Sequence, residues 1–233
     1  MSMERVRIHE GDTPVLLIAP HGPDDKNTDH IVESVAREFG AFAVINKGWR
    51  KSKEVDFLGD MANCNDIRHL HCDVVREEML HPILRFTSRI NRKYGEKALV
   101  LVIHGCSDAV RKKAQDEYLD IIVGHGAGDP PAYSCKRRLK NAFVYHLINE
   151  GFGVYQGKSG GKYSGKSRNN LNQLFSAWYP QYDANSLQLE IVRELRCEQE
   201  MIQITVDGLV SALDALMMFD DTTNLDPGEI NEI

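Results

Sequence analysis

The sequence has few cysteines, no long hydrophobic run and no surplus of positive charge. Its five cysteines among 233 residues form no CxxC pair, which disfavours both a disulfide framework and a thiolate zinc site. The longest strongly apolar runs, VLLIA and ALVLVI, are far shorter than the roughly 20 residues that span a bilayer. The first fourteen residues carry charges where a signal peptide needs an apolar core. We therefore expect a cytoplasmic protein with reduced thiols and no membrane partner.

Negative charge is concentrated at the C-terminal end. Residues 220–233 contain five acids and no base, whereas residues 1–219 hold 29 acids against 28 bases. A nucleic-acid-binding protein normally carries a basic excess on one face, so this balance argues against a nucleic-acid partner. We expect a single domain over residues 1–219 and a solvated acidic tail over residues 220–233.

Short apolar runs alternate with longer amphipathic stretches along the chain. The apolar runs predict buried strands, and the amphipathic stretches predict helices that cover them. This order predicts an α/β fold with three layers, a mostly parallel or mixed sheet having helices on both faces. The apolar stripe within 201–219 is interpreted as core packing, with a homodimer interface as the alternative. The predicted strands are 14–20, 41–46, 98–104, 120–124, 152–156 and 186–191, and the predicted helices are 28–40, 66–95 with a break near Pro82, 134–151, 168–178 and 198–219.

Polar side chains stand at the ends of several predicted strands. His21 follows the first strand, His104 closes the third, and Glu190 lies within the last. The carboxyl ends of parallel strands gather the functional groups in such folds. Two imidazoles with a carboxylate suit zinc, which in hydrolases takes three protein ligands and keeps a position for water. Either Asp24 or Asp25 could complete the ligand set, and Glu190 is the candidate general base.

A series of short motifs runs in order between about residues 14 and 195: PVLLIAPHGP, NDIR, VIHG, DIIVG with the Ser134–Cys135 pair after it, the Gly160–Gly161 pair and LQLE. Together they resemble the N-formylglutamate amidohydrolases, which are distant relatives of the zinc carboxypeptidases. The resemblance implies a phosphorylase/hydrolase-like α/β fold and zinc-dependent hydrolysis of an amide bond in a small acidic N-acyl amino acid or a short peptide. It makes His21, His104 and the acid after His21 metal ligands, and Glu190 the general base.

The carboxylate of such a substrate needs a cationic or hydrogen-bonding partner. Arg68 and Arg50 are the candidates, because a guanidinium grips a carboxylate with two parallel hydrogen bonds. Asn46, which closes the second predicted strand, is a further substrate-binding candidate. We expect these three side chains to lie near the carboxyl ends of the strands.

Residues 157–167 form a basic, glycine-rich segment with two competing interpretations. In the first, the backbone N–H groups of Gly160 and Gly161 bind an acidic substrate. In the second, GGKYSGKS at 160–167 is a P-loop whose Lys166 contacts the phosphates of a nucleotide. We favour the first, because only 66 residues follow the loop and no apolar strand ending in aspartate comes after it. A third possibility is a non-catalytic relative that keeps the fold but not the metal.

Overall fold

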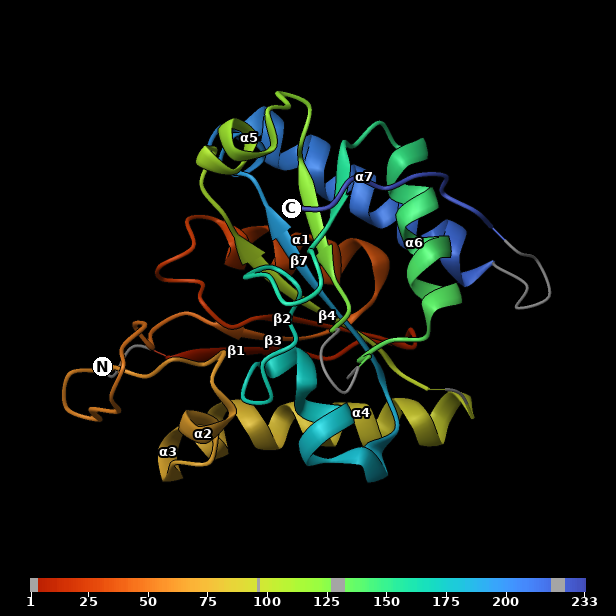
Figure 1. Cartoon of the computed structure of the whole chain (residues 1–233). Coiled ribbons are helices and arrows are strands. Elements are labelled where there is room, and N and C mark those ends of the chain that lie inside the picture. Colours follow the sequence, from red (N-terminus) through yellow and green to blue (C-terminus); the bar gives the residue numbers. More distant parts are fainter. Residues whose placement is uncertain (1–3, 96, 127–132, 219–224) are drawn as a thin grey trace.

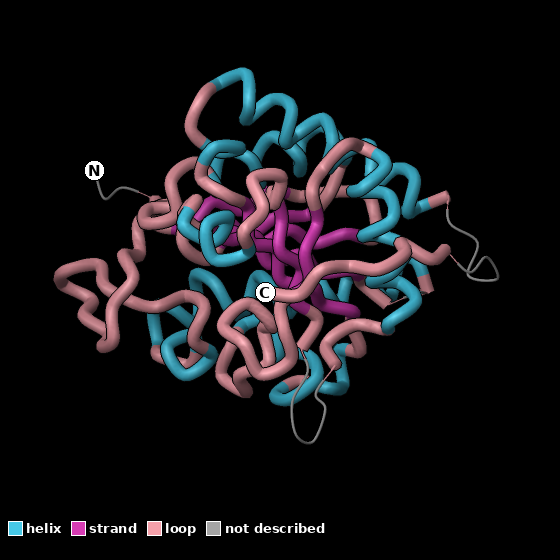
Figure 2. Tube along the Cα trace, turned by 45° about the horizontal axis from the view of Figure 1, so that its top comes forward, coloured by secondary structure: helices cyan, strands magenta, loops and turns pink. Residues whose placement is uncertain are grey.

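The computed structural model describes residues 4–95, 97–126, 133–218 and 225–233. Its centre is a seven-stranded mixed sheet with the strand order β1-β3-β2-β4-β7-β5-β6. Figure 2 shows these strands enclosed between helices. The α/β fold with helices on both faces of a mixed sheet is therefore confirmed. The strands are β1 (Val6–His9), β2 (Val15–Ala19), β3 (Phe42–Asn46), β4 (Leu99–Gly105), β5 (Ile121–Gly124), β6 (Val154–Gln156) and β7 (Asn185–Ile191).

The helices divide into two layers, one on each face of the sheet (Figure 1). Successive side chains of β2 point to opposite faces of the sheet. Leu17 packs in the core on the side of α1, α6 and α7, whereas Leu16 and Ile18 pack in the core on the side of α4. None of the described helices is both long enough and apolar enough to cross a membrane. The α-helices are α1 (Thr28–Phe39), α2 (Ile67–Leu70), α3 (Asp73–Val75), α4 (His81–Tyr94), α5 (Ala109–Ala114), α6 (Arg137–Asn149) and α7 (Gln199–Met217).

The direction of the strands decides which loops share an edge. Strands β3, β2, β4 and β7 run parallel to one another. Strand β1 pairs antiparallel with β3, and β5 pairs antiparallel with β7 and parallel with β6. The carboxyl ends of β2, β4 and β7 therefore meet at one edge, while the strand ends of β5 and β6 point the other way.

The six predicted strands are all present, but two elements were not predicted. Strand β1 has the charged sequence VRIH, and its side chains are only partly buried at the sheet edge. Helix α5 is a short, lysine-rich helix with one buried residue, Val110. Both lack the apolar periodicity on which the sequence analysis depended, because little of their surface is covered.

The helical segments also differ in detail from the prediction. The stretch 66–95 breaks at Cys72 and not near Pro82, because residues 73–94 are helical without a gap. A π-turn at Arg76–Leu80 leads into α4. The stretch 168–178 is no α-helix, since it consists of a 3-10 turn at Leu171–Gln173 followed by a π-turn.

The C-terminal residues are not the solvated tail that we expected. Asn231 accepts a hydrogen bond from the backbone N–H of Gln156, and the N–H of Ile233 donates to the carbonyl of Gln156. Ile233 is buried. Residues 231–233 therefore extend the sheet beside β6, because the open edge of β6 leaves backbone groups that need partners. Residues 225–230 have no regular secondary structure and are exposed or partly buried, and residues 220–224 of the predicted tail lie outside the described residues.

A buried arginine ties the site edge of the sheet together. Arg196 donates from Nε to the carbonyl oxygen of Ile191 at 3.0 Å and from Nη2 to that of Cys106 at 3.0 Å. Its Nη1 donates to the carbonyl oxygen of Lys26, in the turn after β2. One guanidinium thus joins the segments that follow β2, β4 and β7.

We predict that Arg196→Met lowers the free energy of unfolding by about 2–5 kcal/mol, because three carbonyl groups, two of them in buried hydrogen bonds, lose a charged donor. Arg196→Lys should recover only part of this loss, since an ammonium lacks the planar fork that reaches three acceptors. Urea denaturation measures the effect. The exposed neighbour Arg193 supplies the control, and Arg193→Met should stay within about 0.5 kcal/mol of the wild type. Equal stability of the two methionine variants would contradict the proposed tie.

Candidate metal centre

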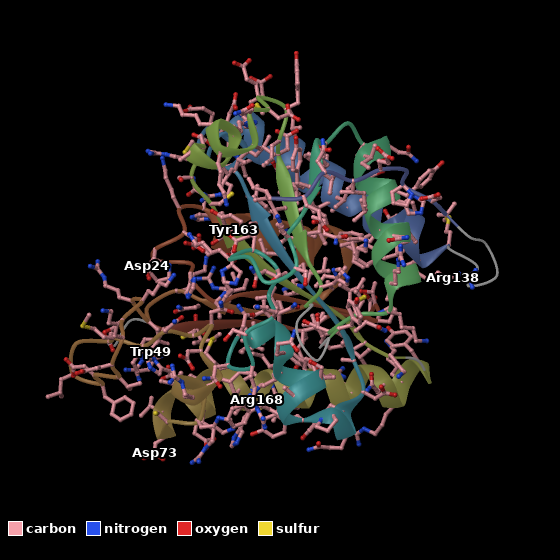
Figure 3. The ribbon with its side chains drawn as sticks, in the orientation of Figure 1. Asp24, Trp49, Asp73, Arg138, Tyr163 and Arg168 are labelled. Carbon is pink, nitrogen blue, oxygen red and sulfur yellow. The ribbon has the colours of Figure 1, made fainter. Side chains whose placement is uncertain are left out.

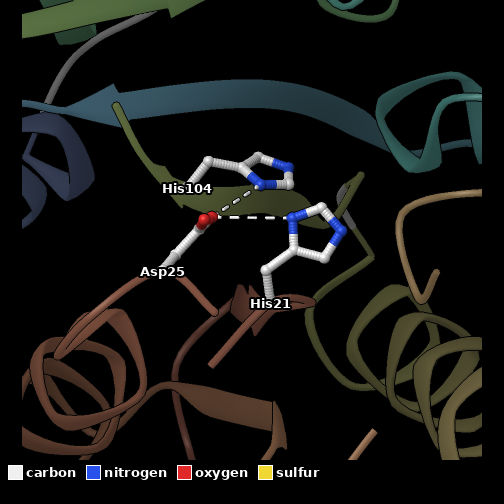
Figure 4. Close-up of side chains that lie close together, drawn as sticks. All are labelled: His21, Asp25 and His104. Atoms are coloured by element: carbon white, nitrogen blue, oxygen red, sulfur yellow. Dashed lines mark ion pairs between the residues drawn. The ribbon is translucent and has the colours of Figure 1, made fainter. Parts of the chain in front are cut away.

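Three side chains, one on β4 and two in the turn after the adjacent strand β2, converge at the carboxyl edge of the sheet. His21 follows β2, His104 lies near the end of β4, and Asp25 comes from the turn after His21. Asp25 Oδ2 lies 3.5 Å from His21 Nδ1 and 3.5 Å from His104 Nδ1 (Figure 4). One ligand atom from each of the three residues lies within 4.8 Å of the other two. The arrangement can hold a metal ion.

The turn after β2 selects Asp25 over Asp24. The backbone N–H groups of Asp24 and Asp25 donate to the carbonyl of His21, at 2.9 and 2.7 Å. Asp25 Oδ2 then accepts from the backbone N–H of Gly105 on β4 at 3.1 Å. Asp24, labelled in Figure 3, instead accepts a hydrogen bond from the backbone N–H of Lys51 at 2.7 Å. The structure brings Asp25 to the histidines and leaves Asp24 outside the group.

Asn63, which the sequence analysis missed, sets the tautomer of His21. Its Oδ1 lies 2.8 Å from His21 Nε2 and also accepts from the backbone N–H of Asn65 at 3.1 Å. A backbone N–H can only donate, so Oδ1 is the acceptor and His21 Nε2 carries the proton. In the neutral form of this imidazole the lone pair is therefore at Nδ1, which faces Asp25. Nothing in the spacing of Asn63 marks it, because it lies in an irregular loop far from His21 in sequence.

The protonation states of the group suit a cation. Burial lowers the pKa of His104 to about 4, although the neighbouring Asp25 carboxylate opposes that shift. Burial also opposes ionisation of Asp25, but the two imidazoles outweigh it and hold the pKa of Asp25 well below its usual value. The three residues therefore offer a cation the ionised carboxylate of Asp25, the neutral imidazole of His104 and the Nδ1 atom of His21. Tetrahedral zinc ligands at about 2.0–2.1 Å from the ion lie about 3.4 Å apart, close to the two 3.5 Å separations here.

Glu190 lies beside this group on β7. It is in register with His104 across the parallel pair of β4 and β7, and its side chain is partly buried. Burial, followed by the charge of Asp25, raises the pKa of Glu190 from 4.5 to about 7. A carboxyl group that changes protonation near neutrality next to a possible metal centre suits proton transfer.

The two predicted arginine anchors do not contact the metal centre. Arg68 is exposed and bound to Asp66, through Nε at 3.0 Å and Nη2 at 2.6 Å. Arg50 is also exposed, and its backbone pairs with Asp60 and Ala62. Arg68 lies in the short helix α2, and Arg50 lies in the segment between β3 and α2.

Asn46 has a structural role in place of the expected substrate contact. Its Nδ2 donates to the carbonyls of Pro20 and Trp49, at 2.7 and 2.8 Å. Its Oδ1 accepts from the backbone N–H groups of Gly48 and Trp49, at 3.1 and 2.8 Å. Asn46 is fully buried, and these four bonds occupy both ends of its amide. It joins the end of β3 to the end of β2.

The glycine-rich segment does not have the geometry of a P-loop. It follows β6 at the edge of the sheet, and the next regular element in the described chain is the 3-10 turn Leu171–Gln173. A P-loop needs the N-terminus of an α-helix for its phosphates, so the nucleotide interpretation is wrong. The N–H of Gly161 donates to the carbonyl of Lys158 at 2.7 Å, so it is not free for an anion. Gly160 has a φ of 84°, which glycine adopts without strain.

The chain was compared with known proteins. No family model and no curated protein matches it. Among solved structures, an N-formylglutamate amidohydrolase from Ralstonia eutropha aligns with a TM-score of 0.59 and 14% identity, over 93% of this chain and 97% of that one. A bacteriophage poly-gamma-glutamate hydrolase aligns with a TM-score of 0.56 and 13% identity, over 92% and 90% of the two chains.

A third solved structure extends the comparison to the peptidases. A metallo-carboxypeptidase from Burkholderia cenocepacia aligns with a TM-score of 0.54 and 12% identity, over 93% of this chain and 66% of that one. At such low identities the likeness concerns the fold alone. The fold of this chain is the one that these amidohydrolase and carboxypeptidase structures share.

Proposed function

We propose that this protein is a zinc-dependent hydrolase that cleaves the amide bond of an N-acyl amino acid. The observation that carries the proposal is the convergence of His21, Asp25 and His104 beside Glu190, whose carboxyl group titrates near neutrality. The likeness to hydrolase structures, one of them a metallo-carboxypeptidase, supports the same reaction class. In this proposal the three converging residues are the metal ligands and Glu190 is the general base.

Each residue of the site has a defined task in the proposed reaction. When bound, zinc would supply a Lewis acid for the amide carbonyl and a water of lowered pKa. Glu190 would take the proton of that water and pass it to the leaving nitrogen. Asn63 keeps the Nδ1 of His21 unprotonated for the metal. Arg68, which lies outside the metal centre and is held by Asp66 through Nε and Nη2, would offer its Nη1 group to the substrate carboxylate.

We predict about one zinc ion per chain, and a loss of zinc affinity greater than about 100-fold in Asp25→Asn and His104→Ala, because two remaining ligands hold zinc poorly. Metal analysis after dialysis against a zinc buffer measures the occupancy. The matched control is Asp24→Asn, which makes the same change one residue away and should bind zinc like the wild type. Full occupancy in a folded Asp25→Asn protein would show that the metal centre is misplaced.

We predict that Glu190→Gln lowers kcat for a hydrolysed N-acyl amino acid by about 10²- to 10⁴-fold. Glutamine keeps the shape of the side chain but cannot accept a proton. Zinc content should stay at the wild-type level, because Glu190 is not in the ligand set. Wild-type turnover in this variant would remove Glu190 from the mechanism, and the absence of turnover in a zinc-loaded wild type would favour a non-catalytic role for the fold.

The raised pKa of Glu190 also predicts a pH-dependent stability. A carboxyl whose pKa is higher in the folded than in the unfolded chain binds a proton more tightly when folded, so its contribution to stability is lost as pH rises from about 4.5 to about 7. In the zinc-free protein, Glu190→Gln should therefore raise the free energy of unfolding by about 1–3 kcal/mol at pH 8 and by almost nothing at pH 4. Urea denaturation at both pH values tests this. An equal effect at the two would contradict the shift.

A further inference from the structure

A chain of side-chain amides lies behind Glu190. Gln188 precedes it by two residues on β7, so both side chains lie on the same face of the sheet. Gln188 is almost fully buried, and its Nε2 donates to Glu190 Oε1 at 2.9 Å. The Oε1 of Gln188 accepts from Asn170 Nδ2 at 3.1 Å. The Oδ1 of Asn170 accepts from the backbone N–H of Asn172 at 2.8 Å.

The direction of these hydrogen bonds is determined at the far end of the chain. The backbone N–H of Asn172 can only donate, so the atom of Asn170 that faces it must be oxygen. Asn170 must then present its NH₂ group to Gln188, whose facing atom must be oxygen. Gln188 consequently presents an N–H donor to Glu190. The opposite orientation of either amide would place two donors or two acceptors together.

The segment that anchors Asn170 also anchors a metal-ligand histidine. Asn170 forms a β-bridge with Asp66, and the backbone N–H of Leu171 donates to the carbonyl of Asn65 at 3.0 Å. Asn65 in turn donates its own N–H to the side chain of Asn63, which bonds to His21. Two segments joined by backbone hydrogen bonds therefore hold His21 through Asn63 and Glu190 through the amide chain.

We propose that Gln188 and Asn170 are positioning residues that form a one-way amide relay and hold the Glu190 carboxylate in place relative to the metal centre. The inference rests on the proposed function of Glu190 as general base. The relay occupies Oε1 of Glu190 with the N–H of Gln188, which leaves Oε2 as the oxygen that receives the proton. It also prevents rotation of a carboxylate that has no cationic partner within hydrogen-bonding distance in the described structure.

The kinetic test uses Asn170→Asp, which keeps an acceptor for the Asn172 N–H but removes the donor to Gln188. The Gln188 amide must then turn its oxygen toward Glu190. We expect kcat to fall by about 10- to 100-fold, with KM and zinc content unchanged. Asn169→Asp adds the same charge one residue away and should leave kcat unchanged. Gln188→Met should reproduce the loss, and it should have no further effect on kcat in a Glu190→Gln background.

A second measurement does not depend on activity. In the zinc-free protein, the side-chain amide resonances of Gln188 are identified by their loss in Gln188→Met. They should shift in both Glu190→Ala and Asn170→Asp, but not in Asn169→Asp. Unshifted Gln188 resonances in the first two variants would overturn the relay.

The two measurements separate the relay from the proposed function. Coupled resonances in a zinc-loaded wild type that hydrolyses no N-acyl amino acid would refute the proposed function and leave the relay standing. An active wild type whose Asn170→Asp and Gln188→Met variants keep full kcat would refute the positioning role.

Discussion

The arrangement of the site residues depends on three hydrogen bonds that the guanidinium group of Arg196 donates. The group lies at the edge of the sheet where β2, β4 and β7 end. It donates to the carbonyl oxygens of Lys26 after β2, Cys106 after β4 and Ile191 at the end of β7. Each of these oxygens belongs to a residue one or two positions from a site side chain. Burial lowers the pKa of Arg196, and the charge of Asp25 opposes that shift. A side chain at Gly105 would meet the guanidinium at 2.3 Å, which explains the glycine there.

Around Arg196, side-chain amides form hydrogen bonds that fix the orientation of the residues at this edge of the sheet. Asn46 joins β3 to β2 with four hydrogen bonds, and Asn63 orients one imidazole. Gln188 and Asn170 form a hydrogen-bonded chain that orients Glu190 in the same way. Amide side chains are suited to orienting their neighbours, because each has a donor end and an acceptor end. When the partner of one end is fixed, the other end can only donate or only accept. Buried polar networks of this kind hold side chains in one orientation when every member is satisfied.

The sheet could be predicted from the sequence because buried parallel strands are continuous apolar runs. VLLIA and LVLVI read as strands without any knowledge of their neighbours. Strand β1 could not be predicted in this way, since an edge strand with charged residues has no such signature. The stretch 66–95 is mostly helical, as predicted, but the predicted break near Pro82 is wrong. The helix breaks at Cys72 instead, where contacts that periodicity does not record decide its course.

The sequence by itself determined the fold class and the edge of the sheet where His21, His104 and Glu190 would gather. The alternation of apolar runs with amphipathic stretches, and the place of a polar residue at or near the end of an apolar run, are both local properties of the chain. Only the tertiary structure decided between Asp24 and Asp25. The two are neighbours in one turn, and what separates them is the N–H of Gly105, 80 residues away, which bonds to Asp25. The orientation of a polar side chain depends on partners distant in sequence, and no pattern within the turn encodes them.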